Sequence, residues 1–460
     1  MSFPTHIFKA YDIRGLYPEE ITEDLAFRIG SAYAVFLKHD TGRDDLTVMV
    51  CRDMRVSSTP LQASLVRGIT EQGVNVVDID LASTPTFYFG VAKYGYDGGV
   101  QVTASHNPAQ FNGFKMVRAN AVAISGETGI MDIRDMAEKN DFPVVETIGN
   151  VSLREGTIQD EVAYALTKAD VSNIKPFHVV VDNGNGMGAL VIDELFKHLP
   201  CTLTRMYFDL DGTFPNHEAN PFKEENNEDI RAKILETGAD LGIMLDGDSD
   251  RVFFMDNTGK TVEPAIVRGI LSQIYLREYP GGAVGYDVRP GKITEDMILG
   301  AGGKPFVTRV GHSLIKEKSR EMNAIFAGES SGHFFVRAPF GFFEMPAIII
   351  LKFLQEISES GKTVREYVAP YETYAHSGEI NFHVADKQNA LNRLRTQYED
   401  HLTQDFDGLS FDFGDWWCNV RMSNTEDAVR LNVEAVNQAV VTAGVKEVSK
   451  IIQKETVLFL

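Results

Sequence analysis

Short apolar runs alternate with segments of helical periodicity along the first 330 residues. The run at residues 46–51 predicts a buried strand, and residues 59–73 predict a helix that ends near Gly73. The pattern restarts near residue 155 and again near residue 264, which is typical of α/β layers with a parallel or mixed sheet. Strands are expected at 46–51, 74–80, 98–103, 177–182, 201–208, 240–245, 283–288, 305–310 and 324–328, and helices at 59–73, 84–94, 155–170, 187–198, 226–237, 264–278, 292–299 and 312–321.

The pattern changes after Gly361. A strand at 378–384, a helix at 387–399, a β-rich stretch at 411–436 and a closing helix at 443–453 predict a smaller α+β domain. We therefore expect an α/β protein of three successive α/β domains followed by one α+β domain. The expected boundaries are 1–149, 150–254, 255–366 and 367–460.

Composition and charge exclude several classes. The hydrophobic fraction of 43% and charged fraction of 24% are those of a globular protein. The apolar run at 345–351 is too short to cross a bilayer and residues 1–6 carry no secretory signal, so we expect a cytoplasmic protein with no membrane partner. A net charge of -21 argues against nucleic acid as a partner. Cys51, Cys201 and Cys418 are widely spaced and predict free thiols.

Three carboxylates, Asp246, Asp248 and Asp250, follow the apolar run at 241–245. At about 5 Å each pair would repel by roughly 3 kcal/mol at an effective dielectric near 20, so the cluster calls for a cation. Oxygen ligands favour Mg²⁺. A calcium EF-hand loop is excluded, because Arg251 and Asn257 stand where it needs Gly and Glu. A solvated acidic turn remains open as the alternative.

Three further loops carry chemical groups after predicted strands. Residues 103–108 (Thr-Ala-Ser-His-Asn-Pro) place the Ser105 hydroxyl beside an imidazole, without the G-x-S-x-G pattern of a hydrolase. Residues 328–333 (Gly-Glu-Ser-Ser-Gly-His) offer groups that bond sugar hydroxyls. Residues 421–426 (Arg-Met-Ser-Asn-Thr-Glu), with Arg430, offer donors suited to a phosphate. Taken alone, a Ser-His pair in a turn is more often a solvated loop, and each of the other two loops is equally consistent with an exposed polar turn.

Together with residues 8–15 (Phe-Lys-Ala-Tyr-Asp-Ile-Arg-Gly), these four loops occur in an order that closely resembles the α-D-phosphohexomutases, specifically the phosphomannomutase/phosphoglucomutase type. The resemblance spans essentially the whole chain. It implies four domains around a central cleft in a monomer or homodimer. It also implies that a sugar phosphate, mannose and/or glucose, is interconverted between its 1-phosphate and 6-phosphate through a phosphoserine and a hexose 1,6-bisphosphate.

The resemblance also implies roles for individual residues. Ser105 would carry the phosphoryl group, and Mg²⁺ would be bound by Asp246, Asp248, Asp250 and an oxygen of that phosphoserine. Proton transfer, charge neutralisation or contacts at the reacting groups would involve His106, Lys115, Arg251 and His312. Substrate would be bound by Tyr11, Arg14, Arg289, Glu329, Ser331, His333, Arg421, Ser423, Asn424, Thr425 and Arg430.

The chain departs from the family pattern in four places. Ser249 replaces a commoner Gly, which is tolerable if the backbone angle there is ordinary. Ser330 stands where Met is frequent, which leaves the preferred sugar open. Residues 343–345 (Phe-Glu-Met) replace Asp-Asp-Gly, and Asp427 replaces a Pro; neither change has a physical account from sequence.

Three other functions are weighed against the mutase. Phosphoglucosamine mutase is the nearest, although its members usually show a different motif at residues 10–15. A phosphatase of the haloacid dehalogenase type would use Asp246 as nucleophile, but Asp250 stands where that motif wants Thr or Val. A non-catalytic sugar-phosphate sensor would keep the same binding groups without turnover.

Overall fold

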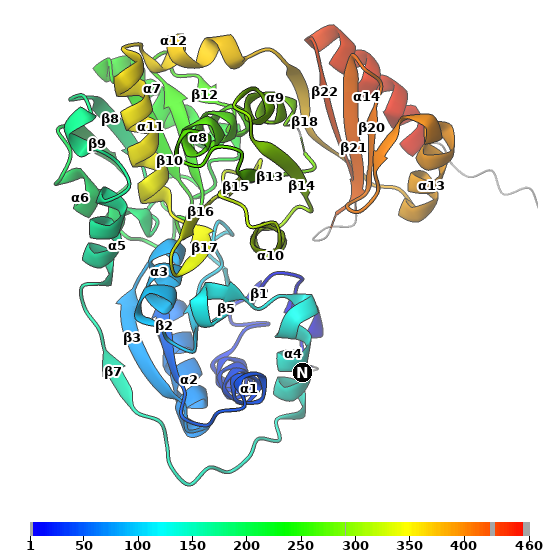
Figure 1. Cartoon of the computed structure of the whole chain (residues 1–460). Helices are drawn as coiled ribbons and strands as arrows, with labels where there is room; N and C mark the ends of the chain where they lie inside the picture. The colour runs from blue at the N-terminus through cyan, green and yellow to red at the C-terminus, as the bar shows by residue number, and fades with distance from the viewer. Residues whose placement is uncertain (1–2, 290, 424–427, 454–460) are drawn as a thin grey trace, which may run out of the picture. The chain divides into compact units, whose positions relative to one another are not determined.

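The computed structural model describes residues 3–289, 291–423 and 428–453, and its chain divides into two compact units. The first unit consists of Met1–Val262 together with Ser331–Tyr367. The second consists of Glu263–Ser330 together with Val368–Leu460. The chain therefore leaves the first unit once, returns to it, and leaves it again (Figure 1).

The first sheet of the first unit combines parallel strands with antiparallel strands at one edge. Its order is β1-β5-β4-β2-β3-β7, and β6 pairs with β5. Strands β4, β2, β3 and β7 are parallel, whereas β1, β5 and β6 pair antiparallel. The strands are β1 (Ile13–Leu16), β2 (Thr47–Arg52), β3 (Asn75–Leu81), β4 (Gly98–Val102), β5 (Phe111–Arg118), β6 (Val122–Ala123) and β7 (Val151–Leu153).

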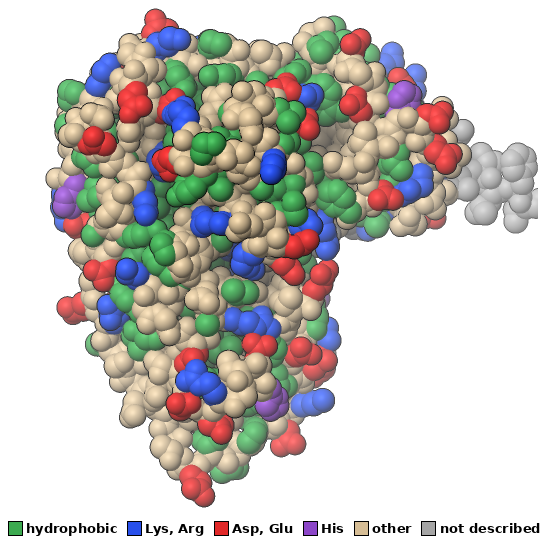
Figure 2. Space-filling view, viewed as in Figure 1, with side chains coloured by type: hydrophobic (Ala, Val, Ile, Leu, Met, Phe, Trp, Pro, Cys, Tyr) green, Lys and Arg blue, Asp and Glu red, His purple; other side chains and the backbone are tan. Residues whose placement is uncertain are grey.

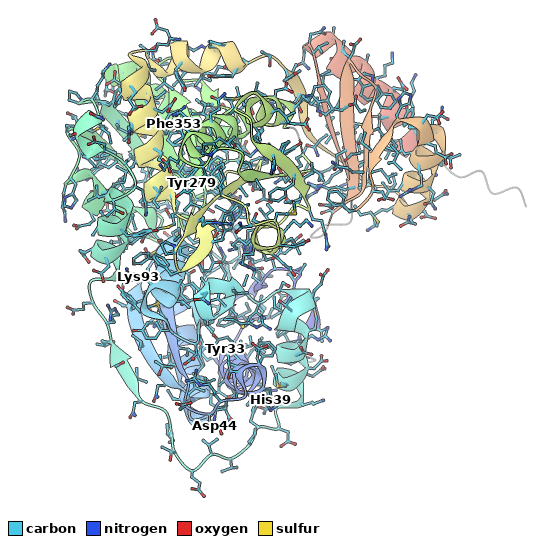
Figure 3. The ribbon with its side chains drawn as sticks, in the orientation of Figure 1. Tyr33, His39, Asp44, Lys93, Tyr279 and Phe353 are labelled. Carbon is cyan, nitrogen blue, oxygen red and sulfur yellow. The ribbon has the colours of Figure 1, made fainter. Side chains whose placement is uncertain are left out.

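Helices cover both faces of this sheet because its buried strands are apolar on both sides. Val48 and Val50 of β2 belong to the core shared with α1, α2 and α4. Met49 points the other way and packs on α3, where a Cβ added at Gly90 would lie 2.7 Å from it. Tyr33 of α1, labelled in Figure 3, donates to a carbonyl of β5 at 2.8 Å. The helices are α1 (Glu23–Thr41), α2 (Ser58–Glu71), α3 (Thr84–Tyr94) and α4 (Met131–Lys139).

The second sheet of the first unit contains a hairpin whose turn holds the three aspartates. Its order is β12-β11-β10-β8-β9; β9, β8 and β10 are parallel, and β11 and β12 are antiparallel. Phe353 of α11, labelled in Figure 3, stacks on Phe254 of β11 with ring centroids 4.2 Å apart. The strands of this sheet are β8 (His178–Asp182), β9 (Thr202–Met206), β10 (Leu241–Leu245), β11 (Val252–Asp256) and β12 (Thr261–Val262). The other elements of this part of the chain are α5 (Thr157–Leu166), α6 (Gly188–Phe196), α7 (Glu228–Thr237), the antiparallel pair β16 (Phe334–Ala338) and β17 (Gly341–Glu344), α11 (Pro346–Ser360) and α12 (Val364–Val368).

The second unit contains a parallel layer and an antiparallel sheet. Strands β14, β13 and β15 are parallel. The antiparallel sheet has the order β18-β22-β21-β20-β19, and its apolar face packs against α13 and α14. The elements are α8 (Pro264–Glu278), β13 (Ala283–Asp287), α9 (Lys292–Gly300), β14 (Lys304–Thr308), α10 (His312–Glu321), β15 (Phe326–Gly328), β18 (Ala375–Phe382), α13 (Lys387–Gln397), β19 (Leu402–Gln404), β20 (Leu409–Asp412), β21 (Trp416–Met422), β22 (Val429–Ala435) and α14 (Gln438–Ile452).

The predicted fold class and the alternation of strands and helices are confirmed, and helices 84–94, 264–278 and 312–321 match at both ends. The helix predicted at 155–170 is shorter, because Gly156 lies in the left-handed region at its start and the helix ends at Leu166. The closing helix starts five residues earlier than predicted, because the Asn437 side chain accepts the Val440 N–H as a cap. Helix α1 and the β16–β17 pair had no prediction.

The surface carries charges of both signs. Figure 2 shows acidic and basic side chains interspersed over the described part of the face in view. Within the described residues, no helix combines the length and apolar character that a bilayer span requires.

Glu161 of α5 is a fully buried carboxyl and gives a stability test of this packing. Its Oε2 accepts a hydrogen bond from Thr86 Oγ1 of α3 at 2.6 Å, and burial raises its pKa to about 7. The folded state therefore holds a proton that the unfolded state, with a pKa near 4.5, has lost. The stability that this proton contributes is present at acid pH and falls as pH rises through about 7.

We expect Glu161→Gln to remove this pH dependence. Between pH 5 and 8 the parent should lose roughly 2–3 kcal/mol relative to the variant, because one pKa unit corresponds to about 1.4 kcal/mol. Chemical unfolding at both pH values measures the difference. Exposed Glu155→Gln is the matched control. Equal pH profiles for the parent and Glu161→Gln would contradict the assignment.

Candidate functional site

The serine loop, residues 103–108, links β4 to β5 in a strained turn. Ser105 is buried and has a φ of 53°, in the left-handed region that non-glycine residues seldom adopt. Its backbone N–H donates to Thr103 Oγ1 at 3.0 Å, and the Asn107 N–H donates to the Ala104 carbonyl at 3.0 Å. These bonds fix the position of the Ser105 hydroxyl.

Arg55 holds the serine loop from beneath, a role that sequence reasoning missed. Its buried guanidinium donates to three loop carbonyls, those of Ser105, Asn107 and Pro108, at 2.8, 2.6 and 2.7 Å, and to the carbonyl of Phe111 at the start of β5 at 3.0 Å. Its Nε donates to Asp53 at 3.1 Å. Both residues follow the end of β2, the same sheet edge from which the serine loop leaves β4. The charged pair Asp53 and Arg55, just after a buried strand, is the sequence feature that could have indicated this role.

The acidic loop, residues 246–251, turns between β10 and β11. Asp246, Asp248 and Asp250 are all buried, and one carboxylate oxygen from each lies within 4.8 Å of the others. Ser249 has a φ of 62°, so the backbone angle at this position is not ordinary and the condition for replacing Gly without strain is not met. The turn keeps a conformation that suits Gly, at a cost of order 1–3 kcal/mol, held by the Ser249 N–H to Asp246 carbonyl bond of 3.0 Å.

Lys115 of β5 offsets the charge of the acidic loop. Its Nζ donates to Asp248 Oδ2 and to Asp250 Oδ2, both at 2.6 Å. Burial alone would lower the pKa of Lys115, but these two carboxylates raise it well above its usual value, so the ammonium stays charged. Thr84 at the start of α3 adds a hydrogen bond to Asp248 Oδ2 at 2.6 Å and was not predicted.

The serine loop and the acidic loop meet in the first unit. Ser105 Oγ lies 3.3 Å from Asp246 Oδ2 and 3.2 Å from His106 Nδ1. Burial, followed by the charges of Arg251 and Arg14, holds the pKa of His106 well below its usual value. The ring is therefore neutral near pH 7. Burial and the two neighbouring aspartates raise the pKa of Asp246 well above its usual value.

The acidic loop fits a divalent cation. Asp248 Oδ1 is buried and accepts no hydrogen bond from the described residues, although Asp248 Oδ2 accepts two. The two carboxylate oxygens of Asp250 also differ in their contacts: Oδ2 accepts from Lys115, and Oδ1 lies 3.1 Å from His333 Nε2. Buried oxygens left open beside three like charges form the donor set of a hard ion.

Arg14, Arg251, Ser331 and His333 lie in the same unit. Arg14 donates to Asp12 at 2.8 Å and to Asn107 of the serine loop at 2.7 Å. Burial opposes the charge of Arg14, but Asp12 outweighs it and raises its pKa. Arg251 N–H donates to Asp246 Oδ1 at 3.1 Å. Ser331 is buried, and Tyr11, a further predicted residue, is half-buried.

The second unit contains a separate group of predicted residues. Arg289 lies 3.1 Å from Glu329 Oε1, which also accepts the Gly311 N–H at 3.0 Å, at the start of α10 where His312 is found. Arg289 Nε donates to Asp287 at 2.5 Å. Buried Arg268, missed from sequence, donates to the same Asp287 at 2.9 Å.

The predicted phosphate loop is described only in part. Arg421 forms an ion pair with Glu379, and Arg430 Nη1 lies 3.1 Å from the same carboxylate. The Ser423 N–H donates to the Ala428 carbonyl at 2.9 Å. Asn424 and Thr425 lie outside the described residues. Glu379, whose position on β18 gave no signal, joins the two arginines.

Family models match the chain in four consecutive parts. They are those of phosphoglucomutase/phosphomannomutase α/β/α domain I at residues 5–144, domain II at 160–259, domain III at 266–374 and the C-terminal domain at 379–451. Together they extend over most of the sequence, in the order in which the motifs occur.

Known proteins resemble the chain over nearly its whole length. A phosphomannomutase of Salmonella montevideo is 38% identical over 440 residues, with 93% of this chain and 94% of the relative covered. "Phosphohexose mutases" of Xanthomonas campestris pv. campestris (strain B100) is 41% identical over 438 residues, covering 94% and 95%. A crystal structure of a phosphoglucomutase/phosphomannomutase family protein from Burkholderia thailandensis matches with a TM-score of 0.86 and 30% identity, covering 98% of each chain.

We expect Lys115→Met to destabilise the metal-free protein and to make it more dependent on Mg²⁺. Removing the ammonium leaves Asp248 and Asp250 without the cation they share, and breaking such a buried pair costs about 3–5 kcal/mol. Thermal unfolding in EDTA and in MgCl₂ measures both effects. Mg²⁺ should raise the melting temperature of the variant more than that of the parent.

Exposed Lys139→Met is the matched control, since it removes the same charge from the surface. An identical Mg²⁺ effect on Lys115→Met and on the parent would mean that the carboxylates do not form the metal site.

Proposed function

This chain belongs to the phosphoglucomutase/phosphomannomutase family and is a phosphohexose mutase, and on that premise we propose that Ser105 is its phosphoryl carrier. The observation that supports this most directly is the 3.3 Å contact between Ser105 Oγ and Asp246, inside a buried acidic loop neutralised by Lys115. The alternatives, phosphoglucosamine mutase and a haloacid dehalogenase phosphatase, are not favoured by the relatives' names.

The proposed reaction is two phosphoryl transfers. In the first, the bond between phosphorus and Ser105 Oγ breaks as the oxygen of a free sugar hydroxyl bonds to phosphorus; that hydroxyl loses its proton, Ser105 Oγ gains one, and a hexose 1,6-bisphosphate is formed. In the second, the bond between the other phosphorus and its sugar oxygen breaks as Ser105 Oγ bonds to that phosphorus; the freed sugar oxygen gains a proton, and the serine hydroxyl loses its own. Neutral His106, 3.2 Å from Ser105 Oγ, is placed to accept that proton.

Three aspartates and a phosphoserine oxygen are proposed to hold Mg²⁺ in the active protein. When bound, the ion supplies neutralisation of the charge that spreads over the transferring phosphoryl oxygens. Asp246, Asp248 and Asp250 provide the ligands, Lys115 fixes two of these carboxylates, and Arg251 adds a positive charge beside them. Bisphosphate added from outside would prime a dephosphorylated serine.

We propose that the substrate is recognised by a sugar reader and a phosphate cradle. Glu329 and Ser331 accept and donate hydrogen bonds suited to sugar hydroxyls. The cradle holds the phosphate that is not reacting, which allows mannose or glucose phosphate to bind in either orientation. The cradle residues are Arg421, Ser423, Asn424, Thr425 and Arg430; Tyr11, Arg14, Arg289, His312 and His333 are proposed further contacts.

The proposed sites divide among four domains. We place their boundaries at 1–149, 150–254, 255–366 and 367–460. The serine loop belongs to the first domain, the acidic loop to the second, the loop at residues 328–333 to the third and the phosphate cradle to the fourth.

Ser105→Ala should abolish the phosphoenzyme and nearly all mutase activity, because alanine offers no nucleophile. Intact-mass measurement of the purified parent should find a phosphate on Ser105, and the variant should lack it. Ser152→Ala, an exposed serine on β7, is the control. Parent-level turnover by Ser105→Ala without added bisphosphate would rule out the carrier role.

Arg421→Ala should lower kcat/KM at least about tenfold, since a charged hydrogen bond is worth roughly 1.5–3 kcal/mol. The loss should affect 1-phosphates and 6-phosphates alike, because both orientations present a phosphate to the same loop. Forward and reverse kinetics measure it, with exposed Arg395→Ala as the control. A defect in one direction alone would show that the cradle is not shared.

A further inference from the structure

Glu344 is a carboxylate at the end of an apolar strand. It closes β17, and Phe343 and Met345 on either side are both fully buried, as Glu344 is itself. A buried carboxylate is stable only where charges or donors surround it. The groups around Glu344 therefore indicate why a charge stands in this hydrophobic segment.

The carboxylate lies beside His333 and Asp250. One ligand atom from each of Glu344, His333 and Asp250 lies within 4.8 Å of the other two. His333 Nε2 is 3.1 Å from Asp250 Oδ1. Antiparallel pairing places Glu344 opposite Phe335, two residues beyond His333, so the register of β16 and β17 sets the position of the carboxylate. Figure 1 shows β17 next to α3, whose N-terminal Thr84 bonds the acidic loop.

His333 is attached to the acidic loop by its backbone as well. Arg251 and His333 form a β-bridge, and the Val252 N–H donates to the Gly332 carbonyl at 3.0 Å. His333 Nδ1 lies 3.0 Å from Ser331 Oγ. The backbone thus brings the ring to the loop, and its side-chain neighbours determine which edge it presents.

Asp250 cannot hold the ring by itself in the active protein. Its Oδ2 already accepts from Lys115, and Asp250 also supplies one of the three carboxylate oxygens that could hold a metal ion. An ion on Asp250 would draw that carboxylate away from the imidazole. Glu344 is not one of the three aspartates that would hold the ion, so an ion bound there leaves the Glu344 carboxylate available to the ring.

We propose that Glu344 is a positioning residue that orients His333 toward the reacting phosphoryl group while Asp250 is engaged by the metal. The proposal rests on the proposed function of the acidic loop. It accounts for the acidic residue in the segment Phe343-Glu344-Met345, which the sequence left unexplained.

A double-mutant cycle of Glu344→Gln and His333→Ala tests the proposal. Glu344→Gln should lower kcat about 10- to 100-fold, as loss of an outer carboxylate partner does, with KM and the Mg²⁺ activation constant changed less than about twofold. In the His333→Ala background it should cause no further loss, because the two residues act as one unit. Glu344→Asp should recover part of the rate, and if the Gln variant does not fold, Asp replaces it in the cycle.

Two results would overturn the proposal. Losses that multiply in the double variant would show that Glu344 acts independently of His333. A raised Mg²⁺ activation constant would make Glu344 a metal ligand, as a second ion held by Asp250, His333 and Glu344 would require. Exposed Glu236→Gln on α7 controls for loss of charge. Intact mass on the parent after incubation with hexose 1,6-bisphosphate separates the premises: absence of phosphate on Ser105 then refutes the proposed function, whereas a failed cycle with phosphoserine present refutes only the role of Glu344.

Discussion

Buried negative charge at the end of β10 is the constraint on which the site in the first unit depends. Three aspartates occupy one turn with almost no exposure, and no arrangement of that turn alone relieves their repulsion. Relief comes from other elements: the Lys115 ammonium from β5 and the Thr84 hydroxyl from α3. Because β5 also follows the serine loop in the chain, the interaction that offsets the charge of the acidic loop holds Ser105 beside it.

The chemistry of the loops was predictable from sequence because it is local. An apolar strand followed by Asp246, Asp248 and Asp250 indicates a cation site whatever the rest of the chain does. The 3.3 Å contact between Ser105 and Asp246 was not available from spacing, since the two lie 141 residues apart, and it entered only through family resemblance. The local pattern predicted which chemical groups the loops carry, and only the tertiary structure shows how far apart these groups lie.

The residues that hold the loops in place could not be found in the same way. Arg55, Thr84 and Glu344 occur in ordinary strand or helix ends, and their function depends on partners 50 or more residues away or on hairpin register. Backbone strain was only partly visible, since Ser249 stands where Gly is commoner but the sequence does not show that this position adopts a positive φ. The predicted starts of two helices were wrong for a local reason, because the helices begin after the N-cap residues Gly156 and Asn437.

Glu379 gives the two arginines of the proposed cradle a partner before any ligand arrives. Its carboxylate joins Arg421 and Arg430, so the guanidinium groups are already compensated by an anion belonging to the protein. The affinity for phosphate is then the difference between two interactions of the arginines, the one with phosphate and the one with Glu379, and not the full attraction between phosphate and two cations. A weakly charged or singly bonding anion gains little by displacing a carboxylate that forms two ion pairs. A cradle built in this way would favour dianions, because the Glu379 carboxylate competes with any ligand for the two arginines.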